Sequence, residues 1–315
     1  MRRAKLNFEK HLDRFRYLVM AALFLASGIL ANLGMAQEKG QTTFSTPEEA
    51  AQALYQAAKN NDERALLEIF GASGRQILYS GDEAEDAESR ATFLQGYAEM
   101  HRLVQEPDGT VTLYIGDKNW PSPIPLVSQG HVWYFDTKAG KQEILFRRIG
   151  RNEISAIQIC RELAAAEREF AQQHQEYAQK IFSDEGRHNG LYWQVAEGQP
   201  ESPIGPLVAQ AVTEGYAKNA RGTEVPYRGY FFHILTSQGE DAPGGAKSYI
   251  DGGRMTGGFA FVAYPAEYRS SGVKTFLVST DGVVFEKDLG RNTEASARSM
   301  KQFNPDSTWR RTEEE

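Results

Sequence analysis

The stretch YRGYFFHILT, residues 227–236, is dense in aromatic side chains, a composition that favours a β-strand. Tyr230, Phe232 and Ile234 fall on one face, and on the other face lie Phe231, His233 and Leu235, so His233 is the one exception to an apolar or aromatic character on both faces. A strand of that kind is typical of a sheet that is covered on both sides. Residues 258–264 repeat the pattern. The sequence therefore predicts a sheet in this half of the chain.

A hairpin and a long helix complete this half. Asp281-Gly282 separates the apolar runs 273–279 and 283–287, and this dipeptide supplies the positive φ angles of a tight turn between paired strands. Upstream, residues 153–182 carry apolar side chains at helical spacing over about eight turns. Because helix and strands come in separate runs, the pattern predicts an α+β fold.

The single cysteine, Cys160, lies within that helix. Ile154, Ile157 and Leu163 recur with it on one helical face. A cysteine on an apolar face behaves as a small hydrophobic residue, so we predict a buried and unreactive thiol. One cysteine also excludes disulfide scaffolds and cysteine-based zinc sites, and we propose no catalytic cysteine.

The first half of the chain shows helices and then strands. Pro47 begins one helix behind Ser45 or Thr46 as N-cap, and Asp62 caps a second. We predict two α+β domains, residues 37–150 and 151–315, the first being a helices-plus-antiparallel-sheet cone. Its predicted strands are residues 110–115, 123–128, 131–135 and 143–148.

Five acids in the run 82–88 open a third predicted helix, which continues through Leu103. A calcium site is the functional alternative for this run. The alternating acid-x-acid-x-acid-Gly pattern of a calcium loop is missing, so we predict a solvated helix start.

The N-terminus resembles an export signal. Residues 2–16 hold six basic residues and two acidic ones, and residues 17–33 contain no charge. Small residues precede the junction after Ala36, which predicts a signal peptide over residues 1–36 and a periplasmic or secreted protein. The alternative is an uncleaved membrane anchor, because about 17 apolar residues reach the lower limit for a span.

Charge excludes one class of partner. The whole chain carries 35 basic and 42 acidic residues, a net charge of −7, and cleavage after Ala36 leaves 29 basic and 40 acidic residues, or −11. A nucleic-acid groove needs a concentrated positive field, so we expect no nucleic-acid partner.

Six segments carry a resemblance to a known family: GRNEISAI (150–157), GLYW (190–193), PYRGYFFHILTSQG (226–239), GGFAFVAYPAEY (257–268), GVVFEKDLG (282–290) and FNPDSTW (303–309). They resemble the exported bacterial family catalogued as domain of unknown function 2950. The resemblance implies an extracytoplasmic location and no particular chemistry.

Two fold resemblances accompany it. TPEEAA (46–51), NDERAL (61–66) and WYFD (133–136) make residues 43–150 similar to the nuclear-transport-factor-2-like cone. The helix-then-sheet order of the second half is similar to the globular domains of type II secretion pseudopilins. Such cones hold ligand pockets, enzymes or assembly surfaces, so the resemblance implies no single activity.

Candidate site residues are aromatic and acidic. No His-x-x-x-His or comparable ligand spacing is present, so we predict neither a metal site nor a cofactor. Side chains that could line a groove for a glycan, a peptide or a partner strand are Tyr192, Trp193, His233, Tyr264, Glu267 and Tyr268; a core role is the alternative for the aromatic ones.

The cone offers a second candidate pocket. Alternation places His131 and Trp133 on one strand face, and Glu143 is a candidate general base beside them. No catalytic motif is recognisable. The leading hypothesis is therefore a non-catalytic extracytoplasmic binding or assembly protein that recognises an unknown envelope protein, peptide or glycan; the alternative is a small-molecule hydrolase or isomerase that uses the cone pocket.

Overall fold

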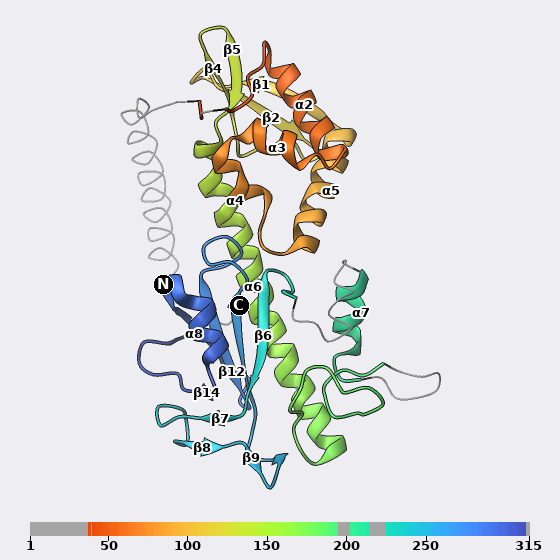
Figure 1. The fold of residues 1–315 in the computed structure, drawn as a ribbon, viewed down its shortest axis with the longest axis vertical. Coiled ribbons are helices and arrows are strands. Elements are labelled where there is room, and N and C mark those ends of the chain that lie inside the picture. Colours follow the sequence, from red (N-terminus) through yellow and green to blue (C-terminus); the bar gives the residue numbers. More distant parts are fainter. Residues whose placement is uncertain (1–36, 39, 195–201, 214–224, 313–315) are drawn as a thin grey trace, which may run out of the picture. The chain divides into compact units, whose positions relative to one another are not determined.

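The computed structural model describes residues 37–38, 40–194, 202–213 and 225–312 (Figure 1). Its helices and antiparallel sheets confirm the α+β class. Contacts divide the chain into Met1–Lys39 and one compact unit, Gly40–Glu315, which is described below. The predicted signal peptide, residues 1–36, lies outside the described residues. Within the described ranges, no helix combines the length and the apolar content needed to cross a bilayer.

The helices of the first half begin at the predicted N-caps. Thr46 Oγ1 accepts a hydrogen bond from the Glu49 N–H at 3.1 Å, and Asp62 Oδ1 accepts one from Ala65 N–H at 3.0 Å. The helical elements are α2 (Pro47–Lys59), α3 (Glu63–Phe70), the 3-10 helix η1 (Ala72–Gly74), α4 (Arg75–Leu78) and α5 (Glu83–Glu99).

A first antiparallel sheet follows these helices in the order β1-β2-β4-β5, with β3 paired to β2. The predicted extension of the third helix through Leu103 is wrong, because α5 ends at Glu99 and Leu103 pairs with Leu113 in the sheet. The strands are β1 (His101–Gln105), β2 (Val111–Ile115), β3 (Trp120–Pro121), β4 (Leu126–Gln129) and β5 (Val132–Phe135).

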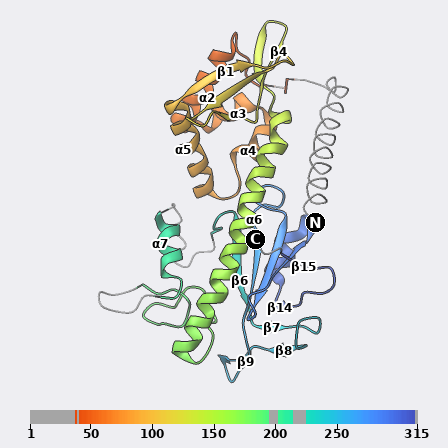
Figure 2. The ribbon, with the colours of Figure 1, turned by 180° about the vertical axis from the view of Figure 1, so that it is seen from behind.

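One long helix, α6 (Thr137–His174), joins both halves of the unit (Figure 2). Asp136 Oδ1 caps it by accepting the Ala139 N–H at 3.1 Å, and Gln175 ends it in the left-handed region at φ 59°. The predicted strand at residues 143–148 is therefore wrong, as is the predicted helix end at Phe182. A short apolar run fits either period, and here helix geometry is favoured by the N-cap.

The predicted apolar stripe of this helix is correct at Cys160, which is fully buried, and at Leu163. It is wrong at Ile154, which is 51% exposed on a side of α6 that faces solvent. The helix also continues without a break through residue 150, where the boundary between two domains is predicted.

A second antiparallel sheet has the strand order β15-β13-β12-β11-β6. The predicted hairpin is confirmed, since β12 and β13 pair across a turn in which Gly282 has φ +76°. Helix α6 packs on β11 and β12, and α8 (Thr293–Ser299) packs on β11. The strands are β6 (Tyr230–Leu235), β11 (Ala260–Pro265), β12 (Lys274–Ser279), β13 (Val284–Asp288) and β15 (Arg310–Arg311).

Smaller elements border this sheet. Helix α7 spans Gly205–Thr213. A three-stranded sheet consists of β14 (Gln302–Phe303), β7 (Ser237–Gln238) and β8 (Lys247–Ser248) in that order. A two-stranded sheet pairs β10 (Arg254–Met255) with β9 (Ile250–Asp251), and a 3-10 helix, η3, spans Gly290–Asn292.

Candidate functional site

Strand β6 forms an edge of the second sheet, because β11 is the strand that pairs with it there. The sequence predicts that β6 is covered on both sides, and this is wrong for its centre: residues 231–234 are half-buried. By contrast, all six residues of the neighbouring strand β11 are buried. The two strands have similar sequences, and their different burial follows from their positions in the sheet.

A cavity of about 400 Å³ lies beside β6, and we call it the β6 cavity. Its walls come from five segments: α6, residues 179–182, Ile204 together with α7, residues 225–227, and β6. Side chains such as Leu163 and Val208 make most of the lining apolar. Its volume lies in the range typical of small-molecule and cofactor pockets.

One polar pair belongs to this wall. His233 lines the β6 cavity, and its Nε2 lies 2.9 Å from the Tyr264 hydroxyl. The two rings stack with their centroids 5.4 Å apart. Because Tyr264 is fully buried behind it, the pair presents the half-buried imidazole to the cavity. The arrangement suits a ligand that is largely apolar and has few polar groups.

Lys180 supplies a charge at the same wall. Its Nζ lies 2.6 Å from Asp184 Oδ1, so the ammonium has a carboxylate partner four residues along the chain. Both side chains are about half exposed, at 48% and 47%, which makes this pair weakly stabilising.

Tyr192 and Trp193 lie close to this region without lining the cavity. The Tyr192 ring contacts that of Phe182, a cavity residue, with centroids 5.9 Å apart. Trp193 is 5% exposed and stacks on His188 with centroids 4.5 Å apart. Trp193 therefore takes the core role that was the alternative for the aromatic candidates.

Glu267 and Tyr268 lie beyond the end of β11 and are not among the residues that line the β6 cavity. Glu267 is exposed, and the Tyr268 hydroxyl donates to Asp288 Oδ2 at 3.2 Å. Of the six candidates in this half, His233 and Tyr264 contact each other at the β6 cavity, and Tyr192 and Trp193 lie close to it. Glu267 and Tyr268 do not take part in this site.

The three residues of the second candidate pocket lie in different surroundings. His131 is exposed in the turn before β5, and Trp133 packs against the core of the first half. Glu143 is exposed on α6 and forms an ion pair with Arg147 at 2.6 Å. Neither of the two cavities described in the structure is lined by any of them.

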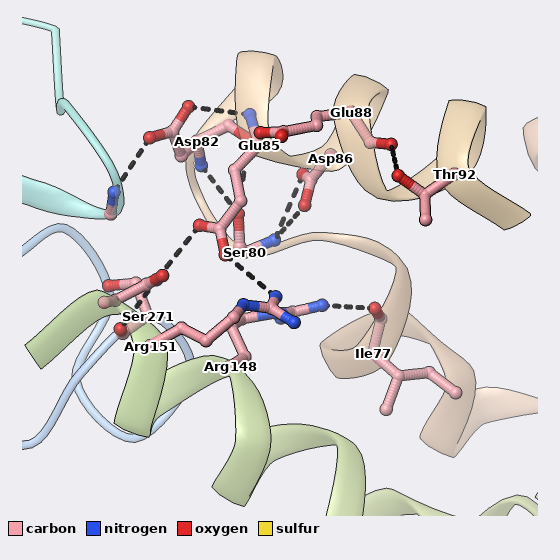
Figure 3. Close-up of polar contacts among 12 residues, drawn as sticks. Ile77, Ser80, Asp82, Glu85, Asp86, Glu88, Thr92, Arg148, Arg151 and Ser271 are labelled. Atoms are coloured by element: carbon pink, nitrogen blue, oxygen red, sulfur yellow. Dashed lines mark hydrogen bonds and ion pairs between the residues drawn. The ribbon is translucent and has the colours of Figure 1, made fainter. Parts of the chain in front are cut away.

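Asp82 and Glu85, two of the five acids at the start of α5, belong to a buried polar cluster (Figure 3). Helix α5 begins there as predicted, with Asp82 as N-cap. The prediction that this start is solvated is correct for Glu83 and Glu88, which are exposed, and wrong for Asp82 and Glu85, which are 1% and 7% exposed. The second half of the chain covers both carboxyl groups: Asp82 Oδ2 accepts the Gly229 N–H at 2.8 Å, and Glu85 Oε2 accepts from Asn152 at 3.0 Å.

Burial perturbs the acids of this cluster. Desolvation raises the pKa of Glu85, against the lowering effect of the Asn152 hydrogen bond. Desolvation likewise raises the pKa of Asp86, whose two oxygens accept the Ser80 N–H. Arg148 donates to the carbonyls of Gln76 and Ile77, at 3.1 and 2.5 Å, and burial lowers its pKa.

These contacts give the cluster a structural role, because its hydrogen bonds join α5, α6 and loops of the second sheet. In the described part of the chain, no group of three or more His, Cys, Asp or Glu side chains is arranged to hold a metal ion. The cluster was missed by reasoning from the sequence, although five acids in seven residues mark its position.

Comparison with known proteins identifies one family. The family described as "Protein of unknown function (DUF2950)" matches residues 41–312. No curated protein and no solved structure matches the chain. The similarities to the cone fold and to pseudopilin domains therefore stay predictions.

Proposed function

The chain belongs to the DUF2950 family of proteins of unknown function, and on that premise we propose that it is an extracytoplasmic binding protein whose ligand occupies the β6 cavity. The observation that carries the proposal is the cavity itself, with about 400 Å³ of space and a mostly apolar lining. Burial of apolar ligand surface in such a site contributes about 25 cal/mol per Å² before the costs of association.

The cavity is tested with an apolar fluorophore, 1-anilinonaphthalene-8-sulfonate. Ala211 is a buried residue of α7 that lines the cavity, so Ala211→Phe places a ring inside it. Ala209 is exposed on the same helix, and Ala209→Phe is the matched control. We expect the folded protein to bind the dye, and Ala211→Phe to weaken binding at least tenfold while Ala209→Phe leaves it unchanged.

Two results would contradict the proposal: dye binding that is the same in all three proteins, or no dye binding by the folded wild-type chain. Near-ultraviolet circular dichroism establishes that each variant keeps its tertiary packing, because a loosely packed chain also binds this dye.

Export is the other part of the proposal, and it rests on the basic and then apolar N-terminus. Mass spectrometry of the protein from the producing cell should show Gln37 as the first residue. An intact N-terminus at Met1 would contradict cleavage.

A further inference from the structure

The outer edge of β6 carries backbone groups that alternate in direction. Gly229 O accepts the Ala266 N–H at 2.9 Å, and the antiparallel register continues through Phe231 opposite Tyr264 and His233 opposite Val262. Ladder hydrogen bonds recur at every second residue of an antiparallel strand. The N–H and C=O groups of Tyr230, Phe232 and Ile234 therefore point away from β11.

This outer edge is closed at both ends. Tyr230 exchanges two backbone hydrogen bonds with Tyr227, at 2.8 and 3.1 Å, and Thr236 O accepts the Tyr249 N–H at 2.9 Å. Between them, the outward groups of Phe232 and Ile234 have no hydrogen-bond partner among the described residues. The open window of the edge is therefore residues 232–234, in which two N–H donors and two C=O acceptors are available for hydrogen bonds.

The open window and the apolar space coincide. Phe232 and Ile234 both line the β6 cavity, with Val208 and Ala211 of α7 in the same lining. An unpaired strand edge is a template for another extended backbone, and apolar pockets beside it accept alternate side chains of that strand. A purely apolar ligand would fill the cavity and leave the outward N–H and C=O groups of Phe232 and Ile234 without hydrogen-bond partners.

We infer that the ligand is an extended peptide segment that adds to β6 as a short sixth strand of the second sheet. This inference rests on the proposed function of the β6 cavity. About three residues of the peptide pair with Phe232–Ile234, because Tyr227 and Tyr249 occupy the edge on either side. The side chains on one face of the bound segment enter the cavity, so they are apolar and alternate with residues that face outward.

The inference is tested with three fluorescein-labelled heptapeptides in which threonine alternates with valine, leucine or phenylalanine. Each is compared with a version N-methylated at its three central residues, which keeps the side chains and removes the N–H groups from both edges. Fluorescence anisotropy should show binding of at least one unmodified peptide, and a loss of at least tenfold in its methylated version.

A variant of the protein tests the same hydrogen bonds from the other side. Ile234→Pro removes one outward N–H and keeps the ladder to β11, because edge strands tolerate proline where the N–H faces outward. Ile234→Val is the matched control, which keeps that N–H. Loss of one hydrogen bond should weaken peptide binding about 2- to 10-fold in Ile234→Pro relative to Ile234→Val.

The outcomes separate the two proposals. Dye binding without binding of any of the three peptides, or equal binding of methylated and unmodified peptides, would overturn the peptide inference and leave the binding function standing. Dimers seen by analytical ultracentrifugation that the unmodified peptide does not dissociate would assign the edge to a second copy of this chain, which also overturns it. Absence of dye binding would remove the proposed function itself.

Discussion

A buried carboxyl group, Glu167 on α6, gives the sharpest test of the packing. Its side chain is fully buried, Oε2 accepts the Ala178 N–H at 2.8 Å, and Oε1 has no hydrogen-bond partner among the described residues. Desolvation raises its pKa from the ordinary value of 4.5 to about 8, although the Ala178 hydrogen bond opposes the shift. The folded protein therefore holds this carboxyl group protonated at neutral pH.

The raised pKa of Glu167 predicts the direction in which the stability of the protein changes with pH. Between pH 4.5 and pH 8 the unfolded chain loses the Glu167 proton and the folded chain keeps it, so the free energy of unfolding falls as the pH rises. Each pH unit in this window costs up to about 1.4 kcal/mol, which amounts to about 2.5 kcal/mol between pH 5 and pH 7. Glu167→Gln removes the titration and keeps an oxygen that accepts the Ala178 N–H.

The assay is urea unfolding of both proteins at several pH values. We expect the stability of Glu167→Gln relative to wild type to grow by about 2.5 kcal/mol from pH 5 to pH 7, since the other titrating groups are common to both proteins. Glu169→Gln is the matched control, because Glu169 is exposed on the same helix. Parallel pH profiles for wild type and Glu167→Gln would refute the reasoning.

Further predictions concern the buried polar cluster and the single thiol. Asn152→Ala leaves Glu85 Oε2 and the Ser271 carbonyl without their donor, so urea unfolding should show a loss of about 2–5 kcal/mol. Arg151→Ala, at a side chain 65% exposed and 3.8 Å from Glu85, should cost less than about 1 kcal/mol, and equal losses would argue against the cluster as a structural clamp. Cys160 is fully buried with its pKa raised to about 12, so a thiol reagent such as 5,5′-dithiobis(2-nitrobenzoic acid) should label it only after unfolding; rapid labelling of the folded protein would contradict this.

Signals between near neighbours in the chain were predictive. The caps at Thr46 and Asp62 begin helices where expected, and the Asp281-Gly282 turn joins the two strands of a hairpin. These features are determined locally, since a helix cap or a tight turn depends on a few consecutive residues. The burial of Cys160 followed from helical spacing for the same reason.

Signals that need a partner from elsewhere in the chain failed. Residues 143–148 fit a strand as well as a helix, and the long helix that begins at Thr137 decides between them. The acids at positions 82 and 85 look solvated in the sequence, and they are buried because Gly229 and Asn152 pack over them. Local composition carries no information about which distant segment covers a charge.

The candidate site shows most clearly which features the sequence determines and which depend on the tertiary structure. The sequence by itself determined the α+β class, the position of β6 and the inclusion of His233 among the site candidates. Only the tertiary structure decided that β6 is an edge strand while the similar β11 lies inside the sheet, and that α7 stands across a cavity from it. The physical reason is that strand order is set by backbone pairing between distant segments. The alternation of side chains within a strand identifies it as a strand and carries no information about which strand pairs with it.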